Sequence, residues 1–318
     1  MKTTELSGVI VPVITPVDAE ERVDEPALRK HLKSLIAAGI HGIFAGGSAG
    51  EGPLLTMGEW ERMLGIAFEE CQGRVHLLGG VMDTSTKRVA ERIRILAGIG
   101  YGYFVVTPTF YLVVPHADEH LRLFGTCKEN SCGMEMIAYN IPSCAGSRIA
   151  VATMCEMARR GWIRYCKESS EDVDYFNLLI SNAQEIGLKV LQGSESCVAA
   201  SLLDGACGIV PCCANFEPQT FVRAYEAAQR RDVVELWRCQ ERIRALRQNL
   251  LREPKNWLGG LKYAMSTRGV GSGKPVSPLQ PLDEEERNRL DNFLRQDWTS
   301  PSGGNYEAVA RLKTAEDG

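Results

Sequence analysis

Two residues at the ends of neighbouring apolar runs could do covalent chemistry. Lys167 ends the run 163–167 and opens the segment KESS. A lysine whose pKa is lowered by burial becomes a nucleophilic amine that can form a Schiff base with a ketone. Tyr139 ends the preceding run and opens the segment YNIPS. A phenol at that place could carry protons to and from the amine, so the pair predicts carbonyl chemistry.

A third segment carries groups that can bind an anion. Residues 46–52 have the sequence GGSAGEG, with the Ser48 hydroxyl at the centre of a glycine-dense turn. Backbone N–H groups in such a turn can approach a carboxylate closely because glycine has no Cβ. A tight turn between a strand and a helix also needs glycines for its geometry alone, so both interpretations stand at this point.

The direction of the Lys167 side chain decides between a structural and a chemical role. Period-two alternation puts Ile163, Tyr165 and Lys167 on one face of a strand. Burying an ammonium group costs several kcal/mol unless the group is paired or neutral, so an inward lysine favours chemistry. The alternatives are a lysine that points outward or snorkels to solvent, and a Tyr139 that only packs with its hydroxyl satisfied.

Apolar runs that alternate with helix-period segments organise the first two thirds of the chain. Eight runs are typical of buried strands, and a helical segment follows nearly every one. Such units pair in parallel through right-handed crossovers, and eight of them close a barrel, so we predict an α/β fold, a (β/α)8 TIM barrel. The rival doubly wound sheet is disfavoured because no G-x-G-x-x-G follows the first run. The predicted strands are 8–14, 42–45, 75–81, 102–106, 134–139, 163–167, 188–191 and 208–211, and the predicted helices are 26–38, 58–72, 84–99, 118–129, 150–159, 173–185 and 197–203.

The pattern becomes purely helical after the eighth strand. Segments of helical period at 218–229, 233–251, 257–266 and 284–295 are separated by glycine and proline. We therefore expect a catalytic barrel over residues 1–215 and a C-terminal helical appendage over residues 216–298. The polar stretch 299–318 is expected to be a flexible tail.

The three segments together resemble the motifs of a known family. GSAGE at 47–51, YNIPS at 139–143 and KESS at 167–170, in this order, are similar to the dihydrodipicolinate synthase / N-acetylneuraminate lyase family of class I aldolases. The resemblance extends from about residue 8 to about residue 282. It implies that Lys167 forms a Schiff base with pyruvate or another 2-oxo acid, and that Tyr139 transfers protons during the reaction.

The resemblance also assigns roles to the glycine turn and to the variable end of the substrate. Ser48 matches the hydroxyl of the proton relay, and the turn of Gly47, Ser48 and Ala49 matches the backbone that holds the substrate carboxylate. Ser169 matches a hydroxyl position that contacts the variable end of the substrate in the lyases. Val210, which lies in the eighth apolar run, is a further expected contact.

Several positions depart from the pattern of the family and bear on the substrate. Cys144 stands where dihydrodipicolinate synthases usually carry an arginine that grips a carboxylate of the aldehyde partner, and Ala49 replaces their second threonine. Glu195 is the one acid retained from the acidic pair with which sialic acid lyases bind sugar hydroxyls. Phe110 occupies the place of a tyrosine that family members lend across a dimer interface. Either the adjacent Tyr111 replaces it or the relay is shortened.

These positions predict a Schiff-base-forming lyase that acts on a 2-oxo acid. The expected reaction releases pyruvate from a deoxy sugar acid or a similar catabolic substrate, or dehydrates it. One alternative is condensation of pyruvate with an aldehyde, and a second is a barrel that binds keto acids without turnover. We expect no cofactor and no metal, because the iminium itself is the electron sink. His116 and His120 lack the glutamate of a zincin motif and are expected at a solvated helix start.

Composition and charge bound the partners of the chain. Its 318 residues include 36 basic and 40 acidic side chains, without a long basic run, so a small molecule is expected rather than nucleic acid or a membrane. No window approaches the ~18 apolar residues of a membrane span. The 11 cysteines include no C-x-x-C pair and predict a reducing cytoplasm. The resemblance implies a homotetramer, a dimer of dimers.

Overall fold

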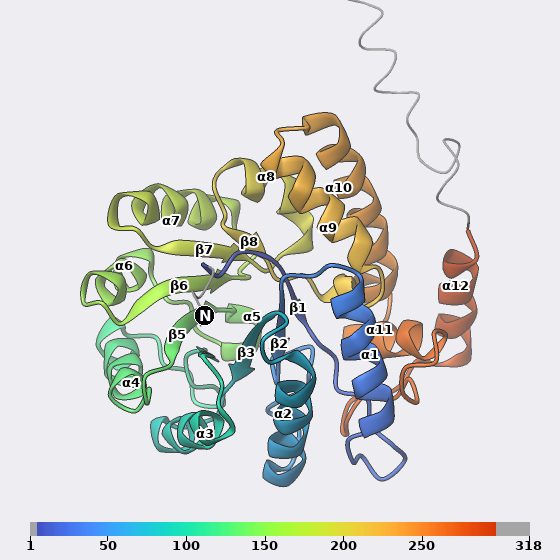
Figure 1. Cartoon of the computed structure of the whole chain (residues 1–318), viewed down its shortest axis with the longest axis horizontal. Helices are drawn as coiled ribbons and strands as arrows, with labels where there is room; N and C mark the ends of the chain where they lie inside the picture. Colours follow the sequence, from blue (N-terminus) through green and yellow to red (C-terminus); the bar gives the residue numbers. More distant parts are fainter. Residues whose placement is uncertain (1–4, 297–318) are drawn as a thin grey trace, which may run out of the picture.

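The computed structural model describes residues 5–296 of the chain and contains a closed barrel of parallel strands (Figure 1). Each strand pairs with its neighbours in chain order, and the last strand pairs with the first. The predicted (β/α)8 barrel is therefore confirmed. Its strands are β1 (Gly8–Pro12), β2 (Gly42–Ala45), β3 (His76–Gly80), β4 (Tyr103–Val106), β5 (Glu135–Asn140), β6 (Ile163–Glu168), β7 (Lys189–Gln192) and β8 (Gly208–Ile209).

Helices surround the barrel on its outer side, as Figure 1 shows. Polar side chains cap the start of several of them: the Asp24, Ser85 and Asp172 side chains each accept a hydrogen bond from the backbone N–H three residues further on. The predicted strands, and the predicted helices up to residue 229, agree with the structure to within two residues at each end. The helices of this part are α1 (Glu25–Ala37), α2 (Met57–Cys71), α3 (Thr86–Ile99), α4 (Ala117–Glu129), α6 (Val151–Arg159), α7 (Val173–Ile186), α8 (Val198–Leu203) and α9 (Pro218–Gln229).

Three short elements at the ends of strands were not predicted. The single helical turn α5 (Pro142–Ala145) follows β5, and the 3₁₀ turns η1 (Glu195–Cys197) and η2 (Cys212–Asn215) follow β7 and β8. A single turn is too short for a 3.6-residue period to appear in the sequence. These three turns lie after the carboxyl ends of the strands, where the active residues of such barrels are found.

The side chains of the barrel divide into an outer layer, packed against the helices, and an inner cluster. The register between β5 and β6 shifts, so that Met136 lies opposite Ile163 and Ile137 lies opposite Tyr165. This bulge leaves Arg164 without a partner in the ladder and turns Ile163 into the outer layer. The expectation that Ile163 shares a face with Tyr165 is therefore wrong, whereas Tyr165 belongs to the inner cluster.

The helical appendage lies to one side of the barrel (Figure 1). Helix α9 packs against β1 and α8, and it also packs against α10 (Val233–Arg247), which contacts η1. The predicted helix 233–251 is an α-helix only to Arg247, after which the π-helical turn η3 (Gln248–Arg252) follows. The remaining helices are α11 (Trp257–Ser266) and α12 (Glu284–Leu294).

Helix α9 lies beyond residue 215 but packs on the barrel strand β1. The expected boundary between the barrel and the appendage at residue 215 therefore stays a prediction. The expected tail, residues 299–318, lies outside the described residues. None of the helices within residues 5–296 is long and apolar enough to cross a membrane.

Candidate active site

Lys167 lies inside the barrel, close to the carboxyl end of β6. Its side chain is 5% exposed, and its Nζ lies 4.1 Å from the ring centroid of Tyr139 and 5.0 Å from that of Phe44. Burial lowers the pKa of Lys167 to about 8, and the nearby Cys212 and Glu195 oppose this shift. The outward or snorkelling orientation is thereby excluded, and about a tenth of the amine is neutral at pH 7.

Tyr139 lies directly opposite Lys167 in the pairing of β5 with β6. Its ring packs edge-on against Phe44, with the centroids 6.4 Å apart, and the side chain is 3% exposed. Burial raises the pKa of Tyr139 above its usual range, while interactions with the Ser169 and Ser48 side chains act in the opposite direction. The structure therefore brings Tyr139, Ser48 and Ser169 together beside the amine, although they come from three different strands.

The glycine-dense turn after β2 is packed tightly against the barrel. Gly47 and Ala49 are buried and Ser48 is half-buried. A Cβ at Gly47 would lie 2.6 Å from the Phe44 ring, so no larger residue fits there without displacement. The Thr15 hydroxyl donates a 2.6 Å hydrogen bond to the carbonyl of Gly50 and fixes the turn from the side of β1. The predicted anion-binding turn is thus held in one conformation next to Tyr139.

The short turns after β5, β7 and β8 place further side chains around the amine. Cys144, on α5, is exposed and interacts electrostatically with Lys167. Glu195, on η1, is buried, and its Oε1 accepts a 2.9 Å hydrogen bond from the backbone N–H of Cys213. Burial raises the pKa of Glu195, and this N–H lowers it. Val210 belongs to the inner cluster of the barrel, next to the end of β8.

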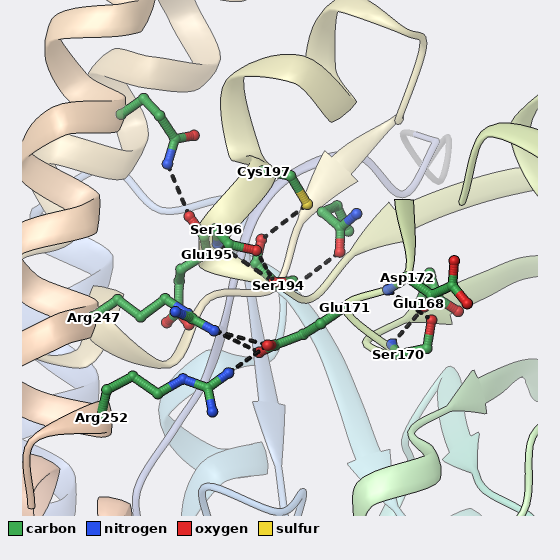
Figure 2. Close-up of polar contacts among 12 residues, drawn as sticks. Glu168, Ser170, Glu171, Asp172, Ser194, Glu195, Ser196, Cys197, Arg247 and Arg252 are labelled. Carbon is green, nitrogen blue, oxygen red and sulfur yellow. Dashed lines mark hydrogen bonds and ion pairs between the residues drawn. The ribbon is translucent and has the colours of Figure 1, made fainter. Parts of the chain in front are cut away.

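Two arginines of the helical appendage reach the loop that follows β6, as Figure 2 shows. The Nη2 atom of Arg247 lies 2.8 Å from both carboxylate oxygens of Glu171, and Arg252 pairs with the same carboxylate. Arg247 also lowers the pKa of Glu195. The appendage thus holds the rim of the barrel at β6 and β7.

Sequence reasoning missed two residues that position the site. A Cβ at Gly193 would lie 2.0 Å from the Ser169 Oγ and 2.9 Å from the Lys167 Cε, so a side chain there would displace both. The Nδ2 of Asn140 donates a 2.7 Å hydrogen bond to the buried carboxylate of Glu168, which ties the end of β5 to that of β6. Both residues stand directly at strand ends, and this position is the feature of the sequence that could have pointed to them.

Three other expected positions lie apart from this cluster. Tyr111 is 89% exposed and has a φ of +77°, so within one chain it does not reach Tyr139. Its neighbour Phe110 packs against the inner cluster. His116 is exposed at the start of α4, but His120 is buried, with its Nε2 3.5 Å from the Ser147 hydroxyl, so its expected place at a solvated helix start is wrong. Within residues 5–296 no group of three or more His, Cys, Asp or Glu side chains could hold a metal ion.

A buried lysine, a buried tyrosine and a glycine turn at the carboxyl ends of the strands define a (β/α)8-barrel enzyme. Comparison with known proteins identifies the family of this enzyme. The model of the dihydrodipicolinate synthetase family matches residues 5–297. An uncharacterized DapA-like lyase of Halobacterium salinarum is 33% identical over 91% of this chain and 93% of its own length.

Two further relatives agree with this comparison. The 4-hydroxy-tetrahydrodipicolinate synthase of Methanothermobacter thermautotrophicus is 30% identical over 70% of this chain and 80% of its own length. The dihydrodipicolinate synthase structure from Bacteroides thetaiotaomicron has a TM-score of 0.85 at 26% identity, and the match covers 92% of this chain and 98% of that one. The chain therefore belongs to the dihydrodipicolinate synthetase family, and it is a lyase.

Proposed function

We propose that this lyase forms a Schiff base between Lys167 and a 2-oxo acid, and that it cleaves a deoxy sugar acid or a similar catabolic substrate to release pyruvate, or dehydrates it. The observation that carries the proposal is the buried Lys167 amine 4.1 Å from the Tyr139 ring, with its pKa lowered to about 8. A neutral amine in a site poor in water is the form that attacks a ketone.

The reaction begins when the neutral amine attacks C2 of the 2-oxo acid. Water leaves, and the resulting iminium accepts the electron pair released at C3, so an enamine forms without a metal ion. Removal of the C4 hydroxyl proton and cleavage of the bond between C3 and C4 release an aldehyde and leave the enamine. The enamine takes up a proton at C3, and hydrolysis of the resulting iminium releases pyruvate and regenerates Lys167. Loss of a hydroxyl from C4 after removal of the C3 proton gives dehydration instead.

Proton transfer is assigned to Tyr139. Its phenol protonates the leaving hydroxyl of the carbinolamine and later accepts a proton from the substrate. The Ser48 and Ser169 side chains interact with this phenol and stabilise its charged form. The backbone N–H groups of the turn at Ser48 and Ala49 bind the substrate carboxylate, since a rigid turn presents them without a cost in conformational entropy.

The variable end of the substrate faces Cys144, Ser169, Glu195 and Val210. The thiol of Cys144 cannot form an ion pair with a carboxylate, which disfavours an aldehyde partner that carries one. Glu195 is an acceptor for hydroxyl groups, which favours a sugar-acid chain. The name of the Methanothermobacter relative supports the alternative, condensation of pyruvate with an aldehyde. Retention of the whole lysine, tyrosine and serine cluster disfavours a barrel that binds without turnover.

The proposal includes a homotetramer in a reducing cytoplasm. Tyr111, Leu112 and Val113 form an apolar patch in one chain, being 89%, 77% and 59% exposed. If a partner subunit covers this patch, Tyr111 would lie at the active site of that partner. All 11 cysteines are free thiols. The mass of the native protein in solution, measured by light scattering, tests the tetramer.

Trapping with pyruvate and borohydride tests the Schiff base. Wild-type protein should gain one reduced pyruvyl group on Lys167, as located by peptide mass spectrometry, and Lys167→Ala should gain none. Lys189→Ala, on the neighbouring strand β7, is the matched control and should be labelled as the wild type is. An unlabelled wild type, or an adduct that persists in Lys167→Ala, would overturn the mechanism.

A panel of 2-oxo-3-deoxy sugar acids then separates the reactions. Release of pyruvate identifies retro-aldol cleavage, and loss of water without release of pyruvate identifies dehydration. Product formation from pyruvate and aspartate semialdehyde at a rate that exceeds every sugar acid would favour the condensation instead.

A further inference from the structure

A buried ion pair joins the helical appendage to the glycine-dense turn. The Nζ of Lys262, on α11, lies 2.5 Å from Oε2 of Glu51, and the two side chains are 3% and 0% exposed. The other carboxylate oxygen of Glu51 accepts a hydrogen bond of 2.6 Å from the backbone N–H of Val276. Both partners of Glu51 therefore come from the chain beyond the barrel, more than 200 residues away in sequence.

Glu51 is part of the same turn as Ser48. Its backbone N–H donates to the carbonyl of Ser48 at 3.1 Å. Its φ of +55° lies in the left-handed region, which a residue other than glycine adopts only where the surrounding structure constrains it. A Cβ at Gly52, the next residue, would lie 2.1 Å from the carbonyl oxygen of Gly46. The turn is too tightly packed for Glu51 to move alone, so a displacement of Glu51 also displaces the backbone of Ser48.

The charge of Glu51 also matters for an anionic substrate. A buried carboxylate without a counter-ion is strongly unfavourable, and it repels a second carboxylate bound close by. Lys262 is the cation that compensates it, and the more distant Glu21 acts on Lys262 in the same direction as Glu51. With the pair intact, the turn presents its N–H groups to a substrate without a competing negative charge.

We propose that Lys262 is a positioning residue for the substrate-carboxylate turn: through Glu51 it holds the Ser48 backbone in place and cancels the charge that would repel the substrate. This inference rests on the proposed function for the identity of the substrate. It gives the helical appendage a role in the reaction, although no residue of α11 belongs to the cluster around Lys167.

The test compares four proteins: wild type, Lys262→Met, the double variant Glu51→Gln/Lys262→Met, and the control Arg242→Met. Arg242 pairs with Glu217 in the same appendage, so the control removes a cation that does not face the turn. The readouts are the pyruvate concentration that half-saturates borohydride trapping, the trapping rate at saturation, and hydrogen exchange of the peptide that covers residues 46–55.

Lys262→Met should raise the half-saturating pyruvate concentration by about tenfold and leave the saturated rate within a factor of about three, because the uncompensated charge acts in a site of low dielectric constant. The double variant removes both charges and should recover most of the affinity, and Arg242→Met should match the wild type. If Lys262→Met acted only by disturbing the packing, adding Glu51→Gln would not restore the affinity for pyruvate.

Two outcomes would overturn the proposal: unchanged half-saturation and exchange in a folded Lys262→Met would refute the positioning, and a double variant as weak as the single one would refute the charge compensation. If Lys262→Met does not fold, the double variant carries the test, because near-wild-type affinity with faster exchange at 46–55 is expected of it. A wild type that forms no adduct refutes the proposed function instead, and hydrogen exchange then still reports whether Lys262 holds the turn.

Discussion

The pH dependence of adduct formation follows directly from the burial of Lys167. With a pKa of about 8, about a tenth of the amine is neutral at pH 7, against roughly one part in three thousand for an ordinary lysine. At low pyruvate concentration the rate of imine formation is proportional to this neutral fraction. The rate should therefore rise about tenfold between pH 6 and pH 7 and level off above pH 8.

The assay follows the wild type with pyruvate kept well below half-saturation. Samples are quenched into borohydride at successive times, and the labelled fraction is read by intact-protein mass spectrometry at each pH. A midpoint near 10.5, the ordinary value for lysine, would refute the claim that burial prepares the amine. A rate that does not change between pH 6 and pH 8 would refute it equally.

A second variant tests the cause of the shift. Glu195 raises the pKa of Lys167, in opposition to burial. Glu195→Gln removes this charge and should move the midpoint of the profile below that of the wild type. Glu156→Gln, on the outer helix α6, is the matched control and should leave the midpoint in place. An upward movement in Glu195→Gln would contradict the assigned sign.

Three further predictions concern single residues. Tyr139→Phe should slow adduct formation by about 10²–10³-fold, measured at saturating pyruvate, because it removes the proton donor and keeps the packing. Lys167→Met should raise the free energy of unfolding by ~3 kcal/mol below pH 8, since a lysine whose folded pKa is depressed destabilises the fold there; the gain should fade between pH 8 and 10.5, measured by denaturant titration. Tyr111→Phe should slow adduct formation in the native assembly if a partner subunit brings this exposed side chain to the site, and an unchanged rate would assign the relay to Tyr139 and the serines alone.

Local patterns in the sequence account for most of the fold. The spacing of apolar residues located all eight strands because buried parallel strands are continuous apolar runs, and polar caps such as Asp172 mark where helices begin. The short turns α5, η1 and η2 escaped prediction because one turn has no period. The bulge at Arg164 escaped because it depends on the register with β5, which no residue of β6 encodes alone.

The candidate site was foreseen in part for the same reason. Lys167, Tyr139 and the Ser48 turn stand at strand ends, and a closed barrel brings all such ends to one rim. The need for glycine at Gly193 was not foreseen, because it arises from the Ser169 and Lys167 side chains of a neighbouring strand. His120 is likewise buried next to Ser147, which lies beyond β5, and its own helix gives no sign of that neighbour.

Residue types and spacing were thus sufficient to place an amine, a phenol and a glycine turn at the ends of three strands of one barrel, β6, β5 and β2. The state of those groups depends on contacts between distant parts of the chain. Burial among Phe44 and Tyr139 lowers the pKa of Lys167, and Lys262 meets Glu51 across 211 positions of sequence. Desolvation and ion pairing depend on which atoms surround a group, and folding sets those surroundings.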